Sequence, residues 1–439
     1  MRSKRNKKIL FILVFIISIA LVFSSCGQSS NKVSSNSVNK NNKNKQVTIR
    51  VQFWAGAEDR ELWQQIAQNV TKKYPNISVK LETVDWNTYW QKLPAQVAGG
   101  TAADVIGIHW TKAHEYALRG ALLPLDNYIK QQQLDVDDFD QNMFNELTYK
   151  GKVYALPYDY GVMLVFYNKD MFDKYKVPYP TNDNWTWNDM LEIAKKLTNP
   201  TNRDFGFALD GAWWSNMVYI LSNGANYLVN NRTQVSFNDP KAIAAIQWFA
   251  DLINVYHVAP TLSDLTANSL GDRWYAGHIG MYYDGPWSII NSKKNAKFNF
   301  AIAPKPLSPT TGKRTDYVQG SGFGIYSKTK YPEEAFKVVS YFTSKEALTL
   351  LAKNGRAFPA RKSVQQAYYD GVKVDGLQHA MELSLADSIP AYITDNWTET
   401  DNFITQNVLQ PIYFGKAKAA DIIPKYDKQV RELSSKVVK

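Results

Sequence analysis

Hydrophobic and polar positions along the chain follow two periods in turn, one typical of strands and one typical of helices. Residues 47–53 alternate between apolar and polar side chains, which predicts a strand, and residues 58–73 place apolar side chains at helical spacing. The same order returns as a strand over residues 77–81, a helix over residues 87–98 and a strand over residues 105–108. Strands that alternate with helices predict an α/β fold with a buried, parallel sheet.

The alternation continues through the rest of the chain. Residues 158–168 form an apolar run typical of a buried strand, and residues 186–189 (Thr-Trp-Asn-Asp) predict a capping box at the start of a helix. Pro240 and Pro332 each stand where the first turn of an amphipathic helix is expected, because proline loses no hydrogen bond there. The pattern after Gly376 is mostly helical.

The N-terminal segment has the pattern of a secretory signal peptide. Five basic residues within residues 1–8 precede fifteen apolar or small residues, 9–23, and Ser-Ser-Cys26 follows. A membrane span needs about 20 apolar residues, so this stretch is short for one. Cys26 is the only cysteine of the chain, and its position resembles the lipobox of bacterial lipoproteins, whose cysteine is lipidated, although Phe23 stands where Leu is usual. A free thiol is the alternative interpretation.

The positive charge of the chain lies mostly in its N-terminal part. The net charge is +11, but five Lys or Arg residues lie in residues 1–25 and four in residues 26–45, where there is no acid, so residues 46–439 carry +2. Residues 27–45 are almost purely Ser, Asn, Lys, Gln and Val, which predicts a disordered tether near an anionic membrane surface. The charge therefore does not indicate a nucleic-acid partner.

The size of the remaining chain predicts two lobes, and its aromatic content predicts a surface that contacts ligands. Residues 46–439 exceed the limit of roughly 250–300 residues for one core, so two lobes are expected. Aromatic residues make up 13% of the chain, which favours a surface that contacts flat apolar faces. Ligands of open parallel sheets bind beyond the carboxyl ends of the strands. The residues that follow the predicted strands are aromatic or polar: Trp54, His109, Trp110, Asp159 and Tyr160.

Four stretches, in order, resemble the extracellular solute-binding proteins of carbohydrate importers, the family that includes maltose-binding protein. They are residues 99–106, where Ala103 replaces the usual proline, residues 151–170 with the helix at 185–197, residues 276–287, and residues 320–336. The resemblance implies an α/β, two-lobed periplasmic-binding-protein-like fold with a ligand cleft between the lobes. The lipobox-like position of Cys26 implies in addition a lipid-anchored, palmitate-bearing protein on the extracellular face of the cell membrane. Such a protein would deliver an oligosaccharide or other sugar to the permease subunits of an ABC importer by cleft closure, without a cofactor.

The N-terminal pattern sets apart a signal peptide (1–25) and a tether (26–45). The resemblance divides the remaining chain into a first N-lobe part (46–157), a first C-lobe part (158–318), an N-lobe return segment (319–372) and a helical part on the C-lobe (373–439). The chain would thus pass between the lobes more than once.

A sugar ring presents apolar faces and an edge of hydroxyl groups, so its site needs aromatic platforms and polar side chains. Trp287 matches the aromatic platform of the family. The predicted ligand-binding residues are Trp54, Glu58, Asp85, His109, Trp110, Asp159, Tyr160, Trp213, Trp214, Asp284, Trp287, Ser321, Arg356 and Trp397. One of Trp213 and Trp214 is expected to pack inward, and Arg356 is expected to pair either with a structural Asp or with a uronic acid.

Other chemistries are weaker interpretations of this sequence. A secreted carbohydrate enzyme would need two carboxylates, for which Asp159 and Asp284 are the candidates. The acidic run 135–140 lacks the Gly and Glu of a calcium loop, and five scattered His residues give no zinc motif, so no metal is expected. The glycines at 320–324 do not match a dinucleotide fingerprint. A peptide- or metal-binding relative and a repetitive adhesin are further alternatives, although the chain shows no repeats.

Overall fold

The computed structural model describes residues 45–57 and 59–436. The predicted signal peptide, Cys26 and all but the last residue of the predicted tether lie outside the described residues, and so does Glu58. From Gln46 onward the chain forms one compact unit. In the described part of the chain, no helix has both the length and the apolar character needed to cross a membrane.

The larger sheet, called the first sheet below, has five strands in the order β2-β1-β3-β13-β6. These strands are β1 (Val47–Trp54), β2 (Ile77–Val84), β3 (Val105–His109), β6 (Ala155–Gly161) and β13 (Gln319–Ile325). β1 is parallel to β2 and β3, whereas β13 is antiparallel to β3 and β6. The predicted parallel sheet is right for the first three strands and wrong at β13, because β13 enters the sheet from the far end, after the chain has visited the second sheet.

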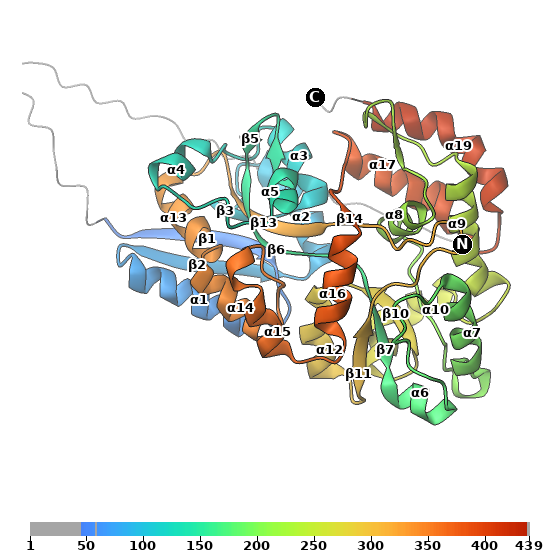
Figure 1. The fold of residues 1–439 in the computed structure, drawn as a ribbon. Coiled ribbons are helices and arrows are strands. Elements are labelled where there is room, and N and C mark those ends of the chain that lie inside the picture. Colours follow the sequence, from blue (N-terminus) through green and yellow to red (C-terminus); the bar gives the residue numbers. More distant parts are fainter. Residues whose placement is uncertain (1–44, 58, 437–439) are drawn as a thin grey trace, which may run out of the picture. The chain divides into compact units, whose positions relative to one another are not determined.

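Helices cover both faces of the first sheet (Figure 1). One face carries α1 (Arg60–Lys73), α13 (Pro332–Phe342) and α14 (Lys345–Lys353), and the other carries α2 (Trp86–Ala98), α3 (Trp110–Leu118) and α5 (Gln141–Glu146). Every second residue of β1 is buried, and the ring of Phe53 lies 4.9 Å from Trp63 of α1 and 5.4 Å from Phe323 of β13. This apolar packing joins β1 to α1 and β13.

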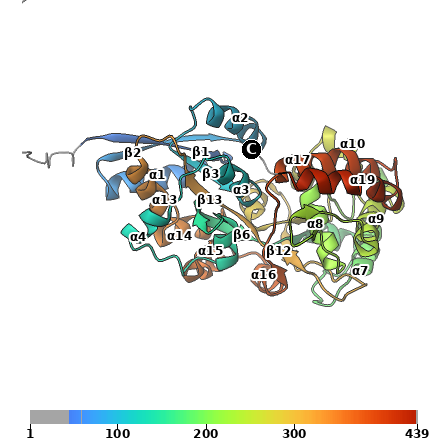
Figure 2. The same cartoon turned by 90° about the horizontal axis from the view of Figure 1, so that it is seen from above.

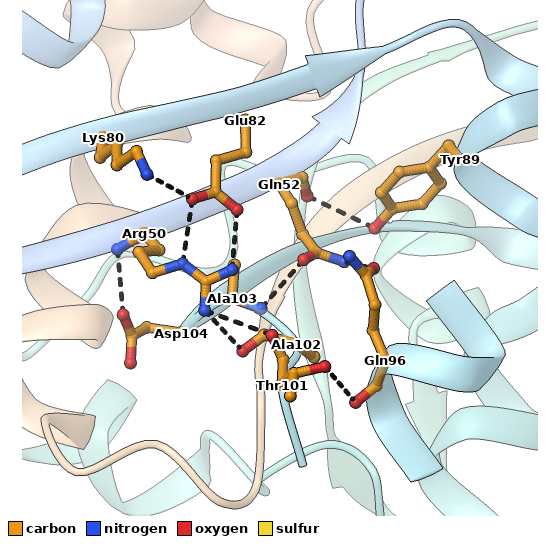
Figure 3. Close-up of polar contacts among 10 residues, drawn as sticks. All are labelled: Arg50, Gln52, Lys80, Glu82, Tyr89, Gln96, Thr101, Ala102, Ala103 and Asp104. Carbon is orange, nitrogen blue, oxygen red and sulfur yellow. Dashed lines mark hydrogen bonds and ion pairs between the residues drawn. The ribbon is translucent and has the colours of Figure 1, made fainter. Parts of the chain in front are cut away.

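Hydrogen bonds tie α2 and β2 to β1 (Figure 3). Arg50 of β1 binds Glu82 of β2 through two bonds, from Nε to Oε1 at 3.0 Å and from Nη2 to Oε2 at 2.8 Å. Gln52 Nε2 donates to Gln96 Oε1 at 3.1 Å, and the Tyr89 hydroxyl donates to the Gln52 carbonyl oxygen at 3.4 Å. Because Gln96 and Tyr89 belong to α2, these bonds position the tryptophans at the start of that helix.

The second sheet has three antiparallel strands in the order β10-β7-β11, namely β7 (Leu164–Asn168), β10 (Met281–Asp284) and β11 (Phe300–Ala303). The single strand predicted over residues 158–168 is therefore wrong. β6 ends at Gly161 in the first sheet, and β7 begins at Leu164 in the second. Both strands are buried throughout, so the apolar run contains no polar residue that marks the change of sheet.

The segments that pass between the sheets meet at a buried ion pair. Asp316 Oδ2 accepts a hydrogen bond from the Met163 backbone N–H at 2.7 Å and lies 2.7 Å from Lys305 Nζ. Both side chains of this pair are at most 1% exposed. Met163 joins β6 to β7, Lys305 follows β11, and Asp316 begins β12 (Asp316–Tyr317), which pairs with β14 (Ser388–Ile389).

The predicted helix starts are confirmed. Thr186 Oγ1 accepts from the Asp189 backbone N–H, and the Asp189 carboxylate accepts from the Thr186 N–H, which begins α7 (Trp187–Leu197). Pro240 and Pro332 are the first residues of α9 (Pro240–Asn254) and α13. Figure 2 shows α9 beside α8 (Trp213–Ser222); α19 (Ala419–Ser434) packs against α9, and α17 (Trp397–Ile404) packs against α19.

The other described elements are short: α4 (Asp126–Gln131), β4 (Thr148–Tyr149), β5 (Lys152–Val153), α6 (Lys169–Tyr175), β8 (Leu228–Val229), β9 (Gln234–Val235), α10 (Leu262–Ala267), α11 (Leu270–Tyr275), α12 (Ile289–Asn295), α15 (Gln366–Val372), α16 (Leu377–Ala386), α18 (Gln410–Tyr413), the 3-10 helices η1 (Pro200–Asn202), η2 (Pro286–Ser288) and η3 (Lys362–Val364), and the π-helix η4 (Thr405–Leu409). The chain after Gly376 is mostly helical, as predicted.

Candidate ligand-binding site

A cavity of about 680 Å³ is lined both by residues of the first sheet and by residues that follow strands of the second. Its walls include the carboxyl ends of β1 and β3, parts of β6 and β13, and the segment after β10. Small-molecule sites in proteins typically occupy about 300–1,000 Å³. The cavity thus has the size of a ligand site and lies where the strand ends predict one.

Most of the predicted binding residues meet in this cavity. Ten of the fourteen line it, namely Trp54, Asp85, His109, Trp110, Asp159, Trp214, Asp284, Trp287, Ser321 and Arg356. Three others, Tyr160, Trp213 and Trp397, are buried outside the lining. The ligand-binding role of the ten lining residues stays a prediction.

Trp287 is held in place by Asp284, three residues before it. The indole Nε1 donates to Asp284 Oδ1 at 2.7 Å, and the Ser288 hydroxyl donates to Asp284 Oδ2 at 2.6 Å. A Cβ atom at Gly285 would lie 2.2 Å from Cη2 of Trp287, so only glycine leaves room for the ring to fold back. Burial raises the pKa of Asp284 to about 6, although these donors oppose the rise. Asp284 therefore orients the indole of Trp287 at the cavity.

The two adjacent tryptophans of α8 have different environments. Trp214 lines the cavity, whereas Trp213 is buried and packs on Phe237 with ring centroids 4.8 Å apart. Successive helical residues point about 100° apart, so the two indoles cannot share one face. As predicted, one of the pair packs inward, and that residue is Trp213. The predicted binding role thus falls to Trp214.

An aromatic wall formed by Trp54, Trp86, Trp90 and His109 closes one side of the cavity. The ring of Trp86 lies 4.8 Å from Trp54, 5.5 Å from Trp90 and 5.1 Å from His109. Asp85 caps α2, the helix that carries two of these rings, by accepting from the Thr88 backbone N–H at 3.0 Å. Trp86 is 41% exposed, so a large apolar surface of this wall faces water.

His109 and Lys112 bring ionisable groups to the same side. Burial lowers the pKa of His109 to about 3, with a further contribution from Lys112, so the imidazole is neutral near pH 7. Burial also lowers the pKa of Lys112, while Glu115 and Asp401 oppose the change. Lys112 Nζ donates to Thr398 Oγ1 at 2.8 Å, which joins α3 to α17.

Trp397 and Tyr160 are buried in the core outside the cavity lining, so their binding roles stay predictions that the cavity does not support. The ring of Trp397 lies behind Trp110, with centroids 6.3 Å apart, and is 2% exposed. Tyr160 packs on Phe358 at 5.2 Å. Because side chains alternate along a strand, Tyr160 points away from the face that Asp159, its neighbour in β6, presents to the cavity.

Arg356 bridges two carboxylates of the cavity lining. Its Nε donates to Asp59 Oδ2, and its Nη1 lies 3.9 Å from Asp159 Oδ2. Its Nη2 donates to the Tyr158 hydroxyl at 3.4 Å. Burial raises the pKa of Asp159 to about 6, while Arg356 opposes the rise. The structural pairing predicted as one alternative for Arg356 is therefore present.

Gly320 allows β13 to approach β6 closely beside Asp159. A Cβ atom at Gly320 would lie 2.3 Å from the Asp159 carbonyl oxygen and 2.6 Å from Met143 Sδ. The neighbouring Ser321 lies opposite Asp159 in the β13–β6 ladder. Close strand packing thus brings Ser321 and Asp159 together at the cavity.

Five buried polar atoms of lining residues have no hydrogen-bond partner among the described residues. They are Nε1 of Trp90, Nε1 of Trp110, Nε2 of Gln319, Oδ1 of Asp59 and Oδ1 of Asp159. A buried polar group left without a partner costs about 1–3 kcal/mol, so such groups call for an explanation. These five atoms are themselves buried, so they lie behind the surface that the cavity exposes.

Sequence reasoning missed several lining residues: Asp59, Trp90, Lys112, Asn291, Gln319 and Asp401. Trp90 carried a usable signal, because it lies four residues after Trp86 and therefore shares its helix face. Asp401 and Asn291 carried none, since the direction in which their helices face depends on tertiary packing.

The described residues offer little to other chemistries. No group of three or more His, Cys, Asp or Glu side chains that could hold a metal ion occurs among them. In the acidic run, Asp140 caps α5 by accepting from the Met143 N–H at 3.0 Å, and Asp138 accepts from the Ser363 hydroxyl at 2.8 Å. A second hollow of about 510 Å³ beside α6 includes Lys174 and Phe298 in its lining but no tryptophan.

Comparison with known proteins gives a consistent result. Residues 55–349 match the family model of bacterial extracellular solute-binding proteins. A maltotriose-binding protein of Pyrococcus abyssi is 26% identical over 309 residues, which are 67% of this chain and 62% of that protein.

Solved structures are similar over most of both chains. An ABC substrate-binding protein of Listeria monocytogenes in complex with cycloalternan superposes with a TM-score of 0.82 at 23% identity, covering 88% of this chain and 98% of that one. A maltose-bound protein of T. maritima gives a TM-score of 0.76 at 22% identity, covering 87% and 98%. At identities of 22% and 23%, these similarities show that the chain shares the fold of the two solved structures.

Proposed function

The chain belongs to the bacterial extracellular solute-binding protein family and has its α/β periplasmic-binding-protein fold, and from this premise we propose that it binds an oligosaccharide for an ABC importer. As a member of this family it is a transport component and not an enzyme. One observation carries the proposal: six tryptophans and five aspartates line one cavity.

The chemistry of the cavity supports a sugar ligand. Tryptophan faces stack on the apolar faces of a pyranose, and the wall around Trp86 lies in the same cavity as Trp214 and Trp287. The polar side chains of the lining, among them Asp159, Asn291 and Gln319, match the hydroxyl edge of the ring. The size of the cavity supports an oligosaccharide rather than an ion or a single small acid.

The ligands of similar proteins support the same class. The Pyrococcus protein is named for maltotriose, and the two similar structures hold cycloalternan and maltose. These ligands are all built from several sugar rings.

The anchoring of the protein is part of the proposal. Lipidation at Cys26, which lies outside the described residues, would hold the chain on the extracellular face of the cell membrane. Residues 26–45 would act as the tether between the anchor and the compact unit. This placement would keep the bound sugar close to the permease subunits.

Delivery would proceed by closure of the cleft. The lobes would consist of residues 46–157 with 319–372 and residues 158–318 with 373–439, and they would close on the ligand about the segments near Asp316. The closed form would then be the state that the permease recognises.

A thermal-shift screen tests the function. The chain from Gln46 onward would be heated with oligosaccharides of starch and of plant cell walls, and release of reducing ends would be measured in the same samples. A ligand at 100 times its Kd adds about 2.7 kcal/mol of stability, which is easily detected. We expect a shift without release. Release of reducing ends would instead indicate an enzyme, and the absence of any shift would contradict sugar binding.

A further inference from the structure

The charged groups that line the cavity are mostly acidic. Five carboxylates line it, those of Asp59, Asp85, Asp159, Asp284 and Asp401. The cationic side chains of the lining are Lys112 and Arg356. His109 adds no positive charge near neutral pH, because burial lowers its pKa to about 3.

Both cations already interact with acids of the protein. The guanidinium of Arg356 pairs with Asp59 and lies 3.9 Å from Asp159, so it carries less charge than the two carboxylates around it. Lys112 donates to Thr398, and Asp401 is among the acids that act on it electrostatically. A ligand carboxylate would therefore have to compete with acids that are fixed in place.

Asp59 and Asp159 stand on either side of Arg356 in the cavity lining. Asp59 is 4% exposed and Asp159 is 7% exposed, so both charges lie in a poorly hydrated part of the lining. An ionised carboxylate only accepts hydrogen bonds, so these side chains offer no donor to a ligand carboxylate.

We propose that Asp59 and Asp159 make the cavity select uncharged sugar rings and reject uronic acids. The inference rests on the proposed function and narrows its ligand class. Like charges placed opposite each other in a desolvated site strongly disfavour the wrong ligand, which is how binding sites gain specificity. The sequence predicts that Arg356 pairs either with a structural Asp or with a uronic acid ligand. Because Asp59 already pairs with Arg356, a uronic acid would not find this guanidinium free.

Calorimetric titration of the chain from Gln46 onward tests the inference with matched sugars. The probes are maltotriose, cellotriose and mannotriose, each also with its C6 hydroxyls oxidised to carboxylates and with those carboxylates converted to methyl esters. For a trimer that binds, we expect the oxidised form to bind at least about 100-fold more weakly, which is about 2.7 kcal/mol. The uncharged ester should recover most of that loss.

The outcomes separate the two proposals. An oxidised trimer that binds as well as its neutral form contradicts the selectivity but leaves sugar binding intact. An ester that binds as poorly as the acid shows that the discrimination is steric, which also contradicts the inference. Failure of every trimer in every form contradicts the proposed function itself, and this inference with it.

Two variants assign the effect to the named residues. Asp59→Asn and Asp159→Asn should each reduce the ratio of acid to neutral Kd by at least about tenfold, because each removes one fixed negative charge. Asp421→Asn, on an exposed position of α19, is the matched control and should leave the ratio unchanged. Unchanged ratios in both Asp59 and Asp159 variants that retain the normal melting temperature would overturn the assignment.

Discussion

The carboxylate of Asp284 accepts a hydrogen bond of 2.7 Å from the indole N–H of Trp287. The same carboxylate accepts from the Ser288 hydroxyl at 2.6 Å and from the Gly285 backbone N–H at 2.7 Å. Three donors thus converge on one partly buried carboxylate within a single turn. Asp284 and Trp287 form one unit, in which the acid fixes the angle at which the ring faces the cavity.

This coupling predicts a non-additive pair of substitutions. Trp287→Ala should weaken sugar binding by about 2 kcal/mol, or roughly 30-fold, because the variant loses a stacking platform. Asp284→Ala should weaken binding by about tenfold, since the ring loses its orientation. In the Trp287→Ala background, Asp284→Ala should add little, because no ring remains to be oriented. Calorimetric titration of the four proteins measures the cycle, and additive losses would show that Asp284 acts on the ligand independently of Trp287.

The adjacent tryptophans of α8 predict a separation of stability from binding. Trp213→Ala should lower the free energy of unfolding by about 3–5 kcal/mol, because it leaves a cavity in the core beside Phe237. Trp214→Ala should change stability far less and weaken sugar binding, because its side chain lines the cavity. Urea unfolding and titration of the two variants are a matched comparison, and the reverse pattern would contradict the assignment of Trp214 to the site.

The sequence predicts the elements well where their pattern is local. The strand and helix order over residues 47–108, the capping box at Thr186 and the prolines at the first helical turns depend on neighbouring residues only. The structure has all of them. The change of sheet between Gly161 and Leu164 depends instead on which distant strands pair with β6 and β7. A run that is buried on both faces has the same pattern in either sheet.

The residues of the candidate site likewise fall into those that a local pattern predicts and those that depend on tertiary packing. Trp54, His109 and Asp159 lie at or near strand ends, and the rule for ligands of α/β sheets brings them to the cavity. Tyr160 and Trp397 have suitable chemistry, but composition does not reveal which side of a strand or helix faces the cleft. Asp401 approaches the cavity from the C-terminal helices, so no local pattern could have linked it to Trp54.

The lipid anchor predicts a change of location on a single substitution. Cys26→Ala should move the protein from the membrane fraction to the medium, because the variant has no thiol to carry the acyl chains. Immunoblots of fractionated cells measure the distribution. Substitution of Ser25 by Ala, which keeps a small residue before the cysteine, is the control and should leave the protein with the membrane. A Cys26→Ala protein that stays in the membrane fraction would contradict the lipobox interpretation.

The buried pair of Lys305 and Asp316 predicts a large loss of stability when one partner is removed. Lys305→Met should cost about 3–5 kcal/mol, because Asp316 would remain charged in a buried site. The double variant Lys305→Met, Asp316→Asn should recover part of this loss, since no unpaired charge remains.

An exposed pair serves as the control for that measurement. Lys169 lies 2.9 Å from Asp375, whose side chain is 74% exposed, and Lys169→Met should cost less than about 1 kcal/mol. Urea unfolding of the variants measures both effects. Equal small losses at Lys305 and Lys169 would show that the segments between the sheets are not fixed by the buried pair.

The raised pKa values of Asp159 and Asp284, about 6 for each, predict opposite effects of pH on stability and on binding. A carboxyl group whose pKa is higher in the folded state takes up a proton on folding, so its stabilising contribution is full below about pH 4 and is lost as the pH rises to about 6.

Sugar binding should follow the reverse trend, because a protonated Asp159 no longer offers two acceptor oxygens and a protonated Asp284 holds Trp287 less firmly. Affinity should therefore fall as the pH falls through about 6, whereas His109, with a pKa of about 3, does not titrate in this range. Titrations and melting curves from about pH 4.5 to about pH 8 measure both trends, and Asp159→Asn should flatten part of each. If affinity stayed constant over this range, the two carboxylates would have no part in holding the ligand or its platform.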